Sequence, residues 1–350
     1  MTPDELTRLL AAFPTTPLGH FPTPIDAMPR LGEKLGVNIL VKRDDATGLA
    51  FGGNKVRQLE YYFGKALAAK ADTVLITGAV QSNYVRTTAA AAAKLGLRCH
   101  VQLEDRVPLH DKSYVSSGNA LLNKLLGAIV HTYPDGEDEA GADACLYEIA
   151  DEERRKGHTP YVIPLGPGNP PTGALGYVSC ALELAGQLDA MDPVDAFVVP
   201  SGSGMTHGGF LVGMRSLGVT APVHGICVRR AADLQADRIL ANCKAIEELI
   251  GAPSIVAAEH VHTVDAALGP GYGRLNDGTY EAVLMAARLE GLLLDTVYTG
   301  RTMAGLIHLA NEGMLAPGST VLFLHTGGTP ALFGYSEVLN ERLGVEVPAQ

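Results

Sequence analysis

The sequence is poor in cysteine, in net positive charge and in long apolar runs, and each shortage excludes a class of protein. Its five cysteines are odd in number and never form a Cys-x-x-Cys pair, so neither a disulfide framework nor a thiolate zinc site is indicated. No apolar run approaches the length of a membrane span, because the alanine run at 89–93 is closed by Lys94 and Gly96. Residues 2–12 have the pattern of a short amphipathic helix and not of a secretory segment. We therefore expect a protein of the reducing cytoplasm with no membrane partner.

Net charge and chain length limit the binding partners and the class of protein. The formal net charge is −11 and the pI is near 5.4, so the overall field repels nucleic acid and anionic lipid. Local basic pockets for small anions remain allowed. A chain of 350 residues with 47% hydrophobic content is long enough for two domains with large cores. These features predict a globular protein of enzyme size.

Short apolar runs alternate with longer helical patterns along the whole chain. This alternation is typical of βα units on mainly parallel sheets, and the predicted strands are residues 38–42, 73–78, 98–103, 128–133, 161–164, 196–200, 223–228 and 320–325. The Gly/Pro-rich stretch 164–171 is a candidate domain crossing, and 48–53 is a second. We therefore predict a small α/β domain at 51–166, inserted into a larger domain made of 1–50 and 167–350.

Lys55 follows Gly52, Gly53 and Asn54 and lies in the first turn of a predicted helix. A single lysine on a helix is usually a solvated charge. A Gly-Gly turn, however, lets backbone and a flat cofactor approach the amine, and such a lysine can form a Schiff base. The predicted position between two domains, where ligands usually bind, adds to this interpretation.

A glycine-rich loop at 201–209 follows the predicted strand 196–200 and precedes a helical pattern. Free N–H groups at the start of that helix would suit a phosphate, although a simple tight turn is also possible. The loop is not a dinucleotide fingerprint, because His207 stands where a third glycine is expected and the next strand ends in Arg229 and Arg230. A Walker lysine is also missing. His207 is a candidate for lining a cofactor or substrate.

Two other kinds of segment place polar groups after apolar runs. Ser82 and Asn83 begin a helix, where they either cap it or hold a substrate carboxylate. Thr299 and Thr326 each precede a glycine turn, and either hydroxyl could bond a ring nitrogen, although isolated residues of this kind are more often turn formers. The pair His260 and His262 has no carboxylate or thiol at ligand spacing nearby, so we expect no metal site.

Seven ordered motifs together resemble the D-cysteine desulfhydrase and 1-aminocyclopropane-1-carboxylate deaminase family of pyridoxal-phosphate enzymes. The resemblance covers nearly the whole chain, through the segments 22–24, 42–45, 52–55, 81–83, 271–273, 298–300 and 326–328. It implies the two-domain fold of the tryptophan synthase β-subunit type, fold type II, in which each domain is an open, mainly parallel sheet flanked by helices. It also implies a homodimer.

The resemblance assigns the cofactor contacts. Lys55 would hold pyridoxal 5′-phosphate through a Schiff base, and Asn54 would contact the 3-oxygen of the ring. Thr299 or Thr326 would lie at the pyridine nitrogen. The phosphate would be bound by the backbone of Ser203, Gly204, Met205 and Thr206.

The resemblance also assigns substrate contacts. The loop Ser82, Asn83 and Tyr84 would bind the substrate carboxylate, while Tyr272 and Tyr298 would face the reacting carbons. Lys55 or a nearby hydroxyl, such as that of Ser82, would remove the α-proton, and Tyr298 is a candidate acid for the departing thiolate. Further substrate contacts are expected from Gly168, Asn169 and His207.

Two departures help to choose a branch of the family. The deaminase branch has a glutamate directly after the tyrosine that matches Tyr298, where this chain has Thr299. A neutral hydroxyl makes the pyridine ring a weaker electron sink than a carboxylate does, which suits β-elimination better than opening of a cyclopropane. The desulfhydrase branch, in turn, usually has His at Tyr84 and Gly-Gly-Ser-Asn at 166–169, so the β-substituent stays open.

We therefore predict β-elimination from a small amino acid. D-cysteine is the leading substrate, giving pyruvate, ammonia and hydrogen sulfide. The alternatives are deamination of 1-aminocyclopropane-1-carboxylate and elimination from cysteate or serine. Outside the family, a nicotinamide-dependent oxidoreductase would use Gly202 to Gly204 for pyrophosphate and Arg229 and Arg230 for a 2′-phosphate, and non-catalytic ligand binding is a third possibility.

Overall fold

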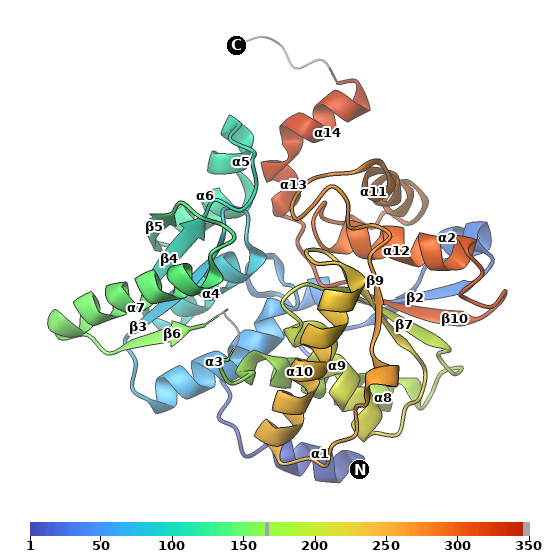
Figure 1. Cartoon of the computed structure of the whole chain (residues 1–350), viewed down its shortest axis with the longest axis horizontal. Helices are drawn as coiled ribbons and strands as arrows, with labels where there is room; N and C mark the ends of the chain where they lie inside the picture. Colours follow the sequence, from blue (N-terminus) through green and yellow to red (C-terminus); the bar gives the residue numbers. More distant parts are fainter. Residues whose placement is uncertain (165–167, 346–350) are drawn as a thin grey trace.

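The computed structural model describes residues 1–164 and 168–345, which form two sheets with helices on both faces of each. Figure 1 shows the smaller sheet on the left and the larger one on the right. The larger sheet has the strand order β1-β2-β10-β7-β8-β9, and every pairing in it is parallel except β1 with β2. Its strands are β1 (Ile25–Ala27), β2 (Asn38–Lys42), β7 (Ala196–Ser201), β8 (Val223–Cys227), β9 (His262–Val264) and β10 (Thr320–Leu324).

The smaller sheet is parallel throughout, in the order β5-β4-β3-β6. Its strands are β3 (Thr73–Ala79), β4 (Arg98–Glu104), β5 (Ile129–Tyr133) and β6 (Pro160–Ile163). Its helices are α3 (Lys55–Ala68), α4 (Asn83–Leu95), α5 (Lys112–Ser116), α6 (Gly118–Leu125) and α7 (Glu139–Arg155).

The other helices belong with the larger sheet or join it to the chain ends. They are α1 (Pro3–Leu10), α2 (Pro29–Leu35), α8 (Leu175–Leu188), α9 (Met205–Ser216), α10 (Ala232–Ile250), α11 (Asp277–Glu290), α12 (Thr299–Asn311), α13 (Ala331–Gly334) and α14 (Ser336–Leu343). Short 3₁₀ turns lie at Asp44–Ala46, Leu49–Phe51, Thr172–Ala174 and Ala258–His260. Within residues 1–164 and 168–345, no helix is long and apolar enough to cross a membrane.

The larger sheet is covered on both faces, which explains why its central strands are continuously apolar. All six residues of β7 are buried. One core joins β7 and β10 to α1, α8, α9 and α10, and a second core joins the opposite face of the sheet to α2, α11 and α12. A third core lies between the smaller sheet and helices α3 and α4. Burial on both faces makes the sheets rigid supports for the loops at their edges.

The predicted fold class is confirmed, and all eight predicted strands are present to within about one residue. The strands β1 and β9 were not predicted, because each is three residues long and only partly buried, so neither leaves a clear apolar run. The smaller sheet lies within the predicted inserted segment 51–166. The predicted crossing at 166–167 is outside the described residues, so the domain limits stay a prediction.

Parallel strands place their carboxyl ends at one edge of each sheet, and these edges face each other in this structure. Ser82 follows β3, Arg106 follows β4, Gly202 follows β7, Arg229 follows β8 and Thr326 follows β10. All five residues line one cavity between the sheets. Ligands of open α/β sheets bind at this edge, so the fold itself indicates where to look for a site.

Candidate active site

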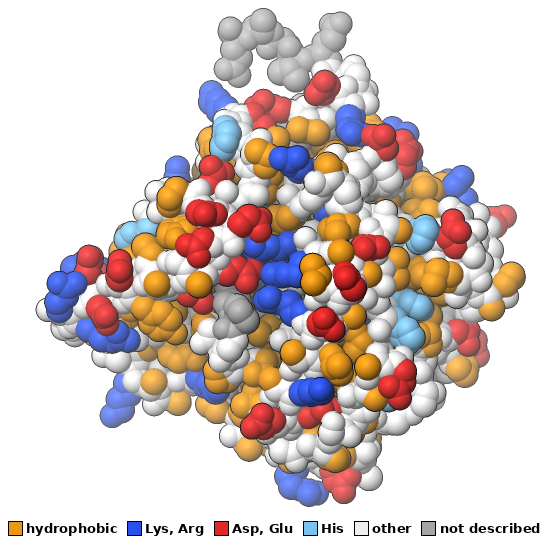
Figure 2. All heavy atoms as spheres, in the orientation of Figure 1, with side chains coloured by type: hydrophobic (Ala, Val, Ile, Leu, Met, Phe, Trp, Pro, Cys, Tyr) orange, Lys and Arg blue, Asp and Glu red, His pale blue; other side chains and the backbone are white. Residues whose placement is uncertain are grey.

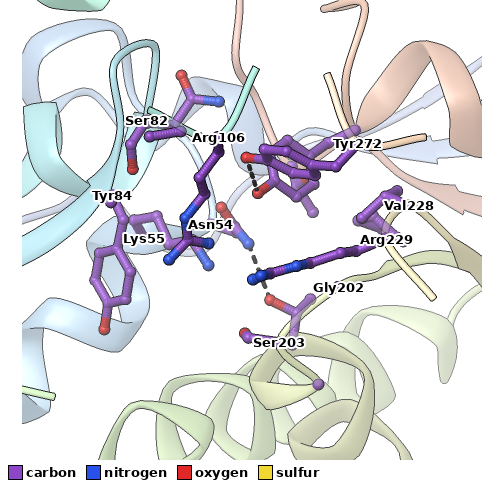
Figure 3. Close-up of a pocket in the computed structure, with 18 of the residues that line it drawn as sticks. Asn54, Lys55, Ser82, Tyr84, Arg106, Gly202, Ser203, Val228, Arg229 and Tyr272 are labelled. Carbon is purple, nitrogen blue, oxygen red and sulfur yellow. Dashed lines mark hydrogen bonds between the residues drawn. The ribbon is translucent and has the colours of Figure 1, made fainter. Parts of the chain in front are cut away.

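The cavity between the two sheets brings together most of the residues that the sequence predicts for a site. It has an empty volume of about 980 Å³, part of which is open to solvent. Figure 3 shows several of its side chains pointing toward one another. The predicted residues on its wall are Asn54, Lys55, Ser82, Asn83, Tyr84, Ser203, Gly204, Thr206, Tyr272, Tyr298 and Thr326.

The loop before Lys55 runs through four successive residues with positive φ. These angles are 43° at Ala50, 70° at Phe51, 62° at Gly52 and 114° at Gly53. Glycine accepts such angles without a steric penalty, but Ala50 and Phe51 do not. The buried guanidinium of Arg86 holds the loop by donating hydrogen bonds to the carbonyl oxygens of Ala50 (2.5 Å) and Gly52 (3.0 Å).

A second contact fixes the loop against the end of β10. A Cβ atom added to Gly53 would lie 3.0 Å from the carbonyl oxygen of Thr326, and one added to Gly327 would lie 2.7 Å from the Cα of Gly53. The two backbones therefore touch. The N–H of Asn54 donates to the carbonyl oxygen of Thr326 at 3.0 Å. This contact needs glycine on both sides and explains the Gly-Gly pair ahead of the lysine.

Helix α3 is anchored just beyond the lysine by a buried ion pair. Arg57 donates to both carboxylate oxygens of Asp44 at 2.9 Å, and Asp44 also accepts from the hydroxyls of Tyr177 (2.7 Å) and Thr23 (2.8 Å). Although burial alone would raise the pKa of Asp44, the neighbouring Arg57 lowers it, so the carboxylate stays charged. The motif at residues 42–45 thus positions the start of α3.

The amine of Lys55 lies in the cavity wall without a counter-ion. In the described part of the chain, no carboxylate lies within ion-pair distance of its Nζ, and the nearest polar partner is Oε1 of Gln58 at 3.4 Å. The Nζ atom lies 4.7 Å from the ring centroid of Tyr84. Burial lowers the pKa of Lys55 to about 8. A larger share of the amine is therefore neutral, and hence nucleophilic, than in a solvated lysine.

The glycine loop after β7 leads directly into α9. Gly204 is the N-cap of this helix, with φ 98°, and it provides no side chain to cap the first-turn N–H groups. A Cβ atom there would lie 2.2 Å from Nδ2 of Asn242, so only glycine fits. The hydroxyl of Thr206 accepts hydrogen bonds from the amides of Asn54 and Gln58, both at 2.9 Å. The helix N-terminus and the lysine loop therefore form one unit with free backbone donors.

The loop after β3 ends at Ser82, which is the N-cap of α4 and accepts the N–H of Val85 at 3.3 Å. Asn83 is held by the side chain of Asn119, whose Nδ2 donates to its Oδ1 at 2.8 Å. Tyr84 presents the face of its ring to Lys55, and its hydroxyl points away from the cavity (Figure 3). Ser82 and Asn83 therefore offer polar atoms to a ligand, whereas Tyr84 offers its ring.

Tyr272 and Tyr298 close the opposite side of the cavity. Their hydroxyl oxygens are 2.9 Å apart and their rings meet edge to face with centroids 6.0 Å apart. Burial, followed by the field of Tyr272, raises the pKa of Tyr298 well above its ordinary value. The hydroxyl of Tyr298 therefore keeps its proton and can act as a donor.

Five of the predicted residues do not line the cavity. Gly168 and Asn169 lie outside its wall, and Met205 is the first residue of α9. Thr299 is buried behind the wall, where its hydroxyl donates to Asp295 at 2.7 Å. The ring of His207 is fully buried within hydrogen-bond distance of Ser201 (3.0 Å), and burial lowers its pKa to about 3, so it is a neutral core residue.

A set of charged residues also lines the cavity, and only Arg229 and Arg230 among them were noted in the sequence. It consists of Arg106 after β4, Glu139 at the start of α7, and Arg238 on α10, together with Arg229 and Arg230. Figure 2 shows Lys and Arg side chains gathered in the hollow at the middle of the face, in a molecule whose net charge is −11. The position of Arg106 just after the end of β4 is the signal in the sequence that could have revealed it.

Comparison with known proteins decides the family. A family model described as pyridoxal-phosphate dependent enzyme matches residues 16–327. The chain belongs to this family. The predicted enzyme class and cofactor are thereby confirmed.

Relatives within the pyridoxal-phosphate dependent enzymes agree on this assignment. The chain is 42% identical over 326 residues to D-cysteine desulfhydrase of Salmonella schwarzengrund (strain CVM19633), covering 93% of this chain and 97% of that protein. A crystal structure of an ACC deaminase homologue superimposes with a TM-score of 0.84 at 35% identity, covering 98% and 99% of the two chains. O-ureido-L-serine synthase, at 17% identity and a TM-score of 0.67, shares the fold.

The residues in the cavity fit pyridoxal phosphate by their own chemistry. The cofactor needs an accessible amine, an anion site and a flat space between them. Lys55 supplies a desolvated amine without a counter-ion, and the N-terminus of α9 supplies backbone donors beside it. The backbone contact between Gly53 and Thr326 keeps bulky side chains out of the space near the lysine.

Proposed function

We propose that this pyridoxal-phosphate dependent enzyme catalyses β-elimination from a small amino acid, with D-cysteine as the leading substrate. The products would be pyruvate, ammonia and hydrogen sulfide. The observation that carries the proposal is the amine of Lys55, which is desolvated and lies beside the free N-terminus of α9 in the cavity. The 42% identity to a protein named D-cysteine desulfhydrase supports the choice of substrate.

In this proposal Lys55 carries the cofactor covalently, and the loop from Ser203 to Thr206 binds its phosphate. Asn54 adjoins both, because its side chain already bonds Thr206. Thr326, on the cavity wall, is better placed for the pyridine nitrogen than Thr299, whose hydroxyl is engaged by Asp295. When bound, pyridoxal phosphate withdraws electrons from the substrate's α-carbon and makes loss of the α-proton and the β-substituent feasible.

The remaining cavity residues would bind and orient the substrate. Ser82 and Asn83, at the N-terminus of α4, would hold the carboxylate, since this end of a helix attracts negative charge. Lys55, with its lowered pKa, or Ser82 would accept the α-proton. Tyr298 would donate a proton to the leaving sulfur. Its hydroxyl is hydrogen-bonded to that of Tyr272.

Opening of the cyclopropane acid is the second candidate, favoured by the structural similarity to an ACC deaminase homologue. Both threonines considered for the pyridine nitrogen are neutral, and a carboxylate there would better stabilise the carbanion that this reaction requires. Elimination from the two remaining candidates, cysteate and serine, would follow the same course, with loss of the α-proton and departure of the β-substituent. The elimination reaction is therefore the better supported choice.

Trapping the cofactor on the lysine tests the core of the proposal. The purified protein should be yellow, and borohydride reduction should bleach it and fix the cofactor mass on the peptide that contains Lys55. Lys55→Ala should abolish both the label and the activity. Full activity of Lys55→Ala would overturn the assignment. The matched control is Lys65→Ala, because Lys65 lies on the same helix but outside the cavity wall.

A substrate panel tests the reaction. D-cysteine, L-cysteine, cysteate, D-serine and the cyclopropane acid are compared for release of pyruvate, 2-oxobutyrate, sulfide and sulfite. Formation of 2-oxobutyrate from the cyclopropane acid alone would refute β-elimination. Tyr84→His should alter the preference among these substrates more than it alters cofactor content, because the Tyr84 ring adjoins the amine of Lys55.

We also propose that the protein forms a homodimer in the cytoplasm. Exposed apolar side chains gather on the outer part of the smaller sheet, on α5, α6 and the edge strand β5: Val115, Leu121, Leu125, Ile129 and Val130. All five cysteines are free, as suits a reducing compartment. Light scattering after size exclusion should give twice the 36.7 kDa chain mass, and Leu125→Glu should lower it.

A further inference from the structure

Arg106 enters the cavity from the loop that follows β4. Its ion-pair partner is Glu104, whereas the three other arginines of the cavity pair with Glu139. Its guanidinium lies among Lys55, Asn54 and the tyrosine pair in the view of Figure 3. The side chain is only 12% exposed, so its charge is largely withdrawn from solvent. A buried guanidinium is costly unless an anion faces it.

The orientation of Arg106 is fixed from behind. Its Nε donates to Oε2 of Glu104 at 2.7 Å, and Glu104 is fully buried and accepts a second hydrogen bond from the hydroxyl of Thr77 at 2.7 Å. Within residues 1–164 and 168–345, the two terminal nitrogens of Arg106 have no hydrogen-bond partner. A rigid fork of donors is thus held toward the cavity, in the geometry that binds an oxyanion through two parallel hydrogen bonds.

The other arginines of the cavity are already engaged. Arg229 and Arg230 pair with Glu139 at 2.5 Å and 3.1 Å. Arg238 donates to the carbonyl oxygen of Ser203 at 2.9 Å and thereby braces the glycine loop. Arg106 is paired as well, with Glu104, but only through its Nε. Among the described residues its two terminal nitrogens stay available to a ligand, whereas those of Arg229 and Arg230 are engaged.

Two anions already have partners in the proposed function. The cofactor phosphate has the N-terminus of α9, and the substrate carboxylate has Ser82 and Asn83. Resting on that function, we propose that Arg106 is a specificity-determining residue that binds a negatively charged β-substituent. The site then takes amino acids whose β-carbon bears a sulfonate or a phosphate ester, in addition to those that bear a thiol.

The chemistry balances without any further reactant except water. The α-proton is lost to a base, and the bond between the β-carbon and the substituent breaks with both electrons leaving on the substituent. Cysteate and one water then give pyruvate, ammonia and sulfite, while O-phosphoserine gives pyruvate, ammonia and phosphate. Arg106 binds the β-substituent in the bound substrate and stays in contact with it as negative charge builds up during bond breaking. It therefore strengthens substrate binding and also stabilises the transition state for departure of the substituent.

The test compares wild type, Arg106→Gln and Arg106→Lys on anionic and neutral leaving groups. Cysteate and O-phosphoserine, each as D and L forms, are the anionic probes, and β-chloroalanine is the neutral one. For Arg106→Gln, kcat/KM for an anionic probe should fall about 10- to 100-fold, the effect of losing a charged hydrogen-bond pair. With β-chloroalanine it should change less than about threefold. Arg106→Lys should retain part of the preference, since the charge remains and the fork is lost.

The control is Arg98→Gln, which removes a half-exposed charge at the opposite end of the same strand and should leave the ratio of the two rates unchanged. The proposal is overturned if wild type releases neither sulfite nor phosphate. It is also overturned if Arg106→Gln slows all substrates equally, which would make Arg106 a partner of the α-carboxylate.

Cofactor binding provides a readout that does not depend on turnover. Titration of cofactor-free protein with pyridoxal phosphate, followed by absorbance, should give the same Kd for wild type and Arg106→Gln. A large increase in Kd would make Arg106 a phosphate ligand and refute the specificity role. Failure of the proposed function looks different, because then no β-substituted amino acid yields pyruvate in any variant.

Discussion

At the scale of single residues, the amine of Lys55 is costly to bury. Burial lowers its pKa from 10.5 to about 8 in the folded protein. Below pH 8 both the folded and the unfolded chain hold this proton, and the folded state bears the full desolvation cost. Between pH 8 and 10.5 the unfolded chain binds the proton more strongly, so the free energy of unfolding rises with pH through this window.

We therefore expect Lys55→Met to stabilise the cofactor-free protein at pH 7. The gain is up to about 3 kcal/mol, since each pKa unit corresponds to about 1.4 kcal/mol. The difference from wild type should shrink as pH rises from 8 toward 10.5. Urea unfolding at pH 7, 8, 9 and 10 measures it, with the exposed Lys124→Met as control. A difference that does not vary with pH would contradict a desolvated amine at this position.

Tyr298 yields a second prediction, because its raised pKa keeps the phenol protonated. Tyr298→Phe should slow elimination of sulfide from D-cysteine about 100-fold, the usual size of a general-acid contribution. Chloride needs no proton to leave, so elimination from β-chloroalanine should change only a few fold. Steady-state release of pyruvate from both substrates measures the contrast. Equal losses on the two substrates would show that Tyr298 is not the acid for the leaving group.

The sequence predicted residues of the cavity wall best where backbone geometry dictates their position. Lys55 and Gly204 were predictable because the glycines in their loops mark places where two segments of backbone come close or where φ is positive. Gly53 lies against the backbone of Thr326, and Gly204 is the left-handed N-cap of α9. His207 lay in the same loop, but the helical turn directs its ring into the core. Arg106 and Glu139 were not predicted, since only the meeting of two sheets brings them to one cavity.

At the scale of elements, the turn before α3 stores backbone strain next to the site. Ala50 has φ 43° and ψ 63°, a left-handed conformation that costs a non-glycine residue about 1–2 kcal/mol. Arg86 and the contact with the end of β10 hold it there. The strain is thus imposed by tertiary contacts around the turn and not by its own sequence.

Replacing the strained alanine tests this account. Ala50→Gly should raise the free energy of unfolding by about 0.5–1 kcal/mol, because glycine accepts the left-handed angle. The matched control, Ala144→Gly, lies on the exposed side of α7 with helical geometry and should lower stability by about 1 kcal/mol. Chemical denaturation of both variants shows whether the free energy of unfolding rises in one and falls in the other. Destabilisation of equal size in both would show that Ala50 is not strained.

Elements were predictable in proportion to their length and burial. The strands β7 and β10 read as continuous apolar runs because both faces are covered by helices. Strand β9 has three half-buried residues and depends on pairing with β8, information that a local pattern does not contain. The order of strands in each sheet likewise follows from long-range pairing, which a single sequence does not reveal.

At the scale of the whole molecule, Glu139 joins the two sheets across the cavity mouth. It begins α7 beside the smaller sheet and pairs with Arg229, Arg230 and Arg238 beside the larger one, at 2.5, 3.1 and 3.9 Å. Burial alone would raise its pKa, but the three arginines together lower it. Its stabilising contribution is therefore present above the carboxyl's unfolded pKa of about 4.3 and is lost as pH falls through the lower folded value.

Glu139→Gln should consequently lower the free energy of unfolding at pH 7 by about 1–2 kcal/mol, because three neighbouring guanidinium groups lose their shared partner. The loss should be smaller at 0.5 M salt than at 0.05 M salt, because screening at the higher concentration weakens the ion pairs in wild type. It should disappear once the pH has fallen below the lowered pKa of the Glu139 carboxyl. The control is Glu137→Gln, whose carboxylate is 80% exposed and pairs with Arg229 alone at 3.2 Å, so its effect should stay below about 0.5 kcal/mol. Thermal unfolding at two salt concentrations and two pH values separates these outcomes. If the two variants behave alike, the arginines are held by the glycine loop and the surrounding protein, and the mouth of the cavity does not depend on an ion pair between the sheets.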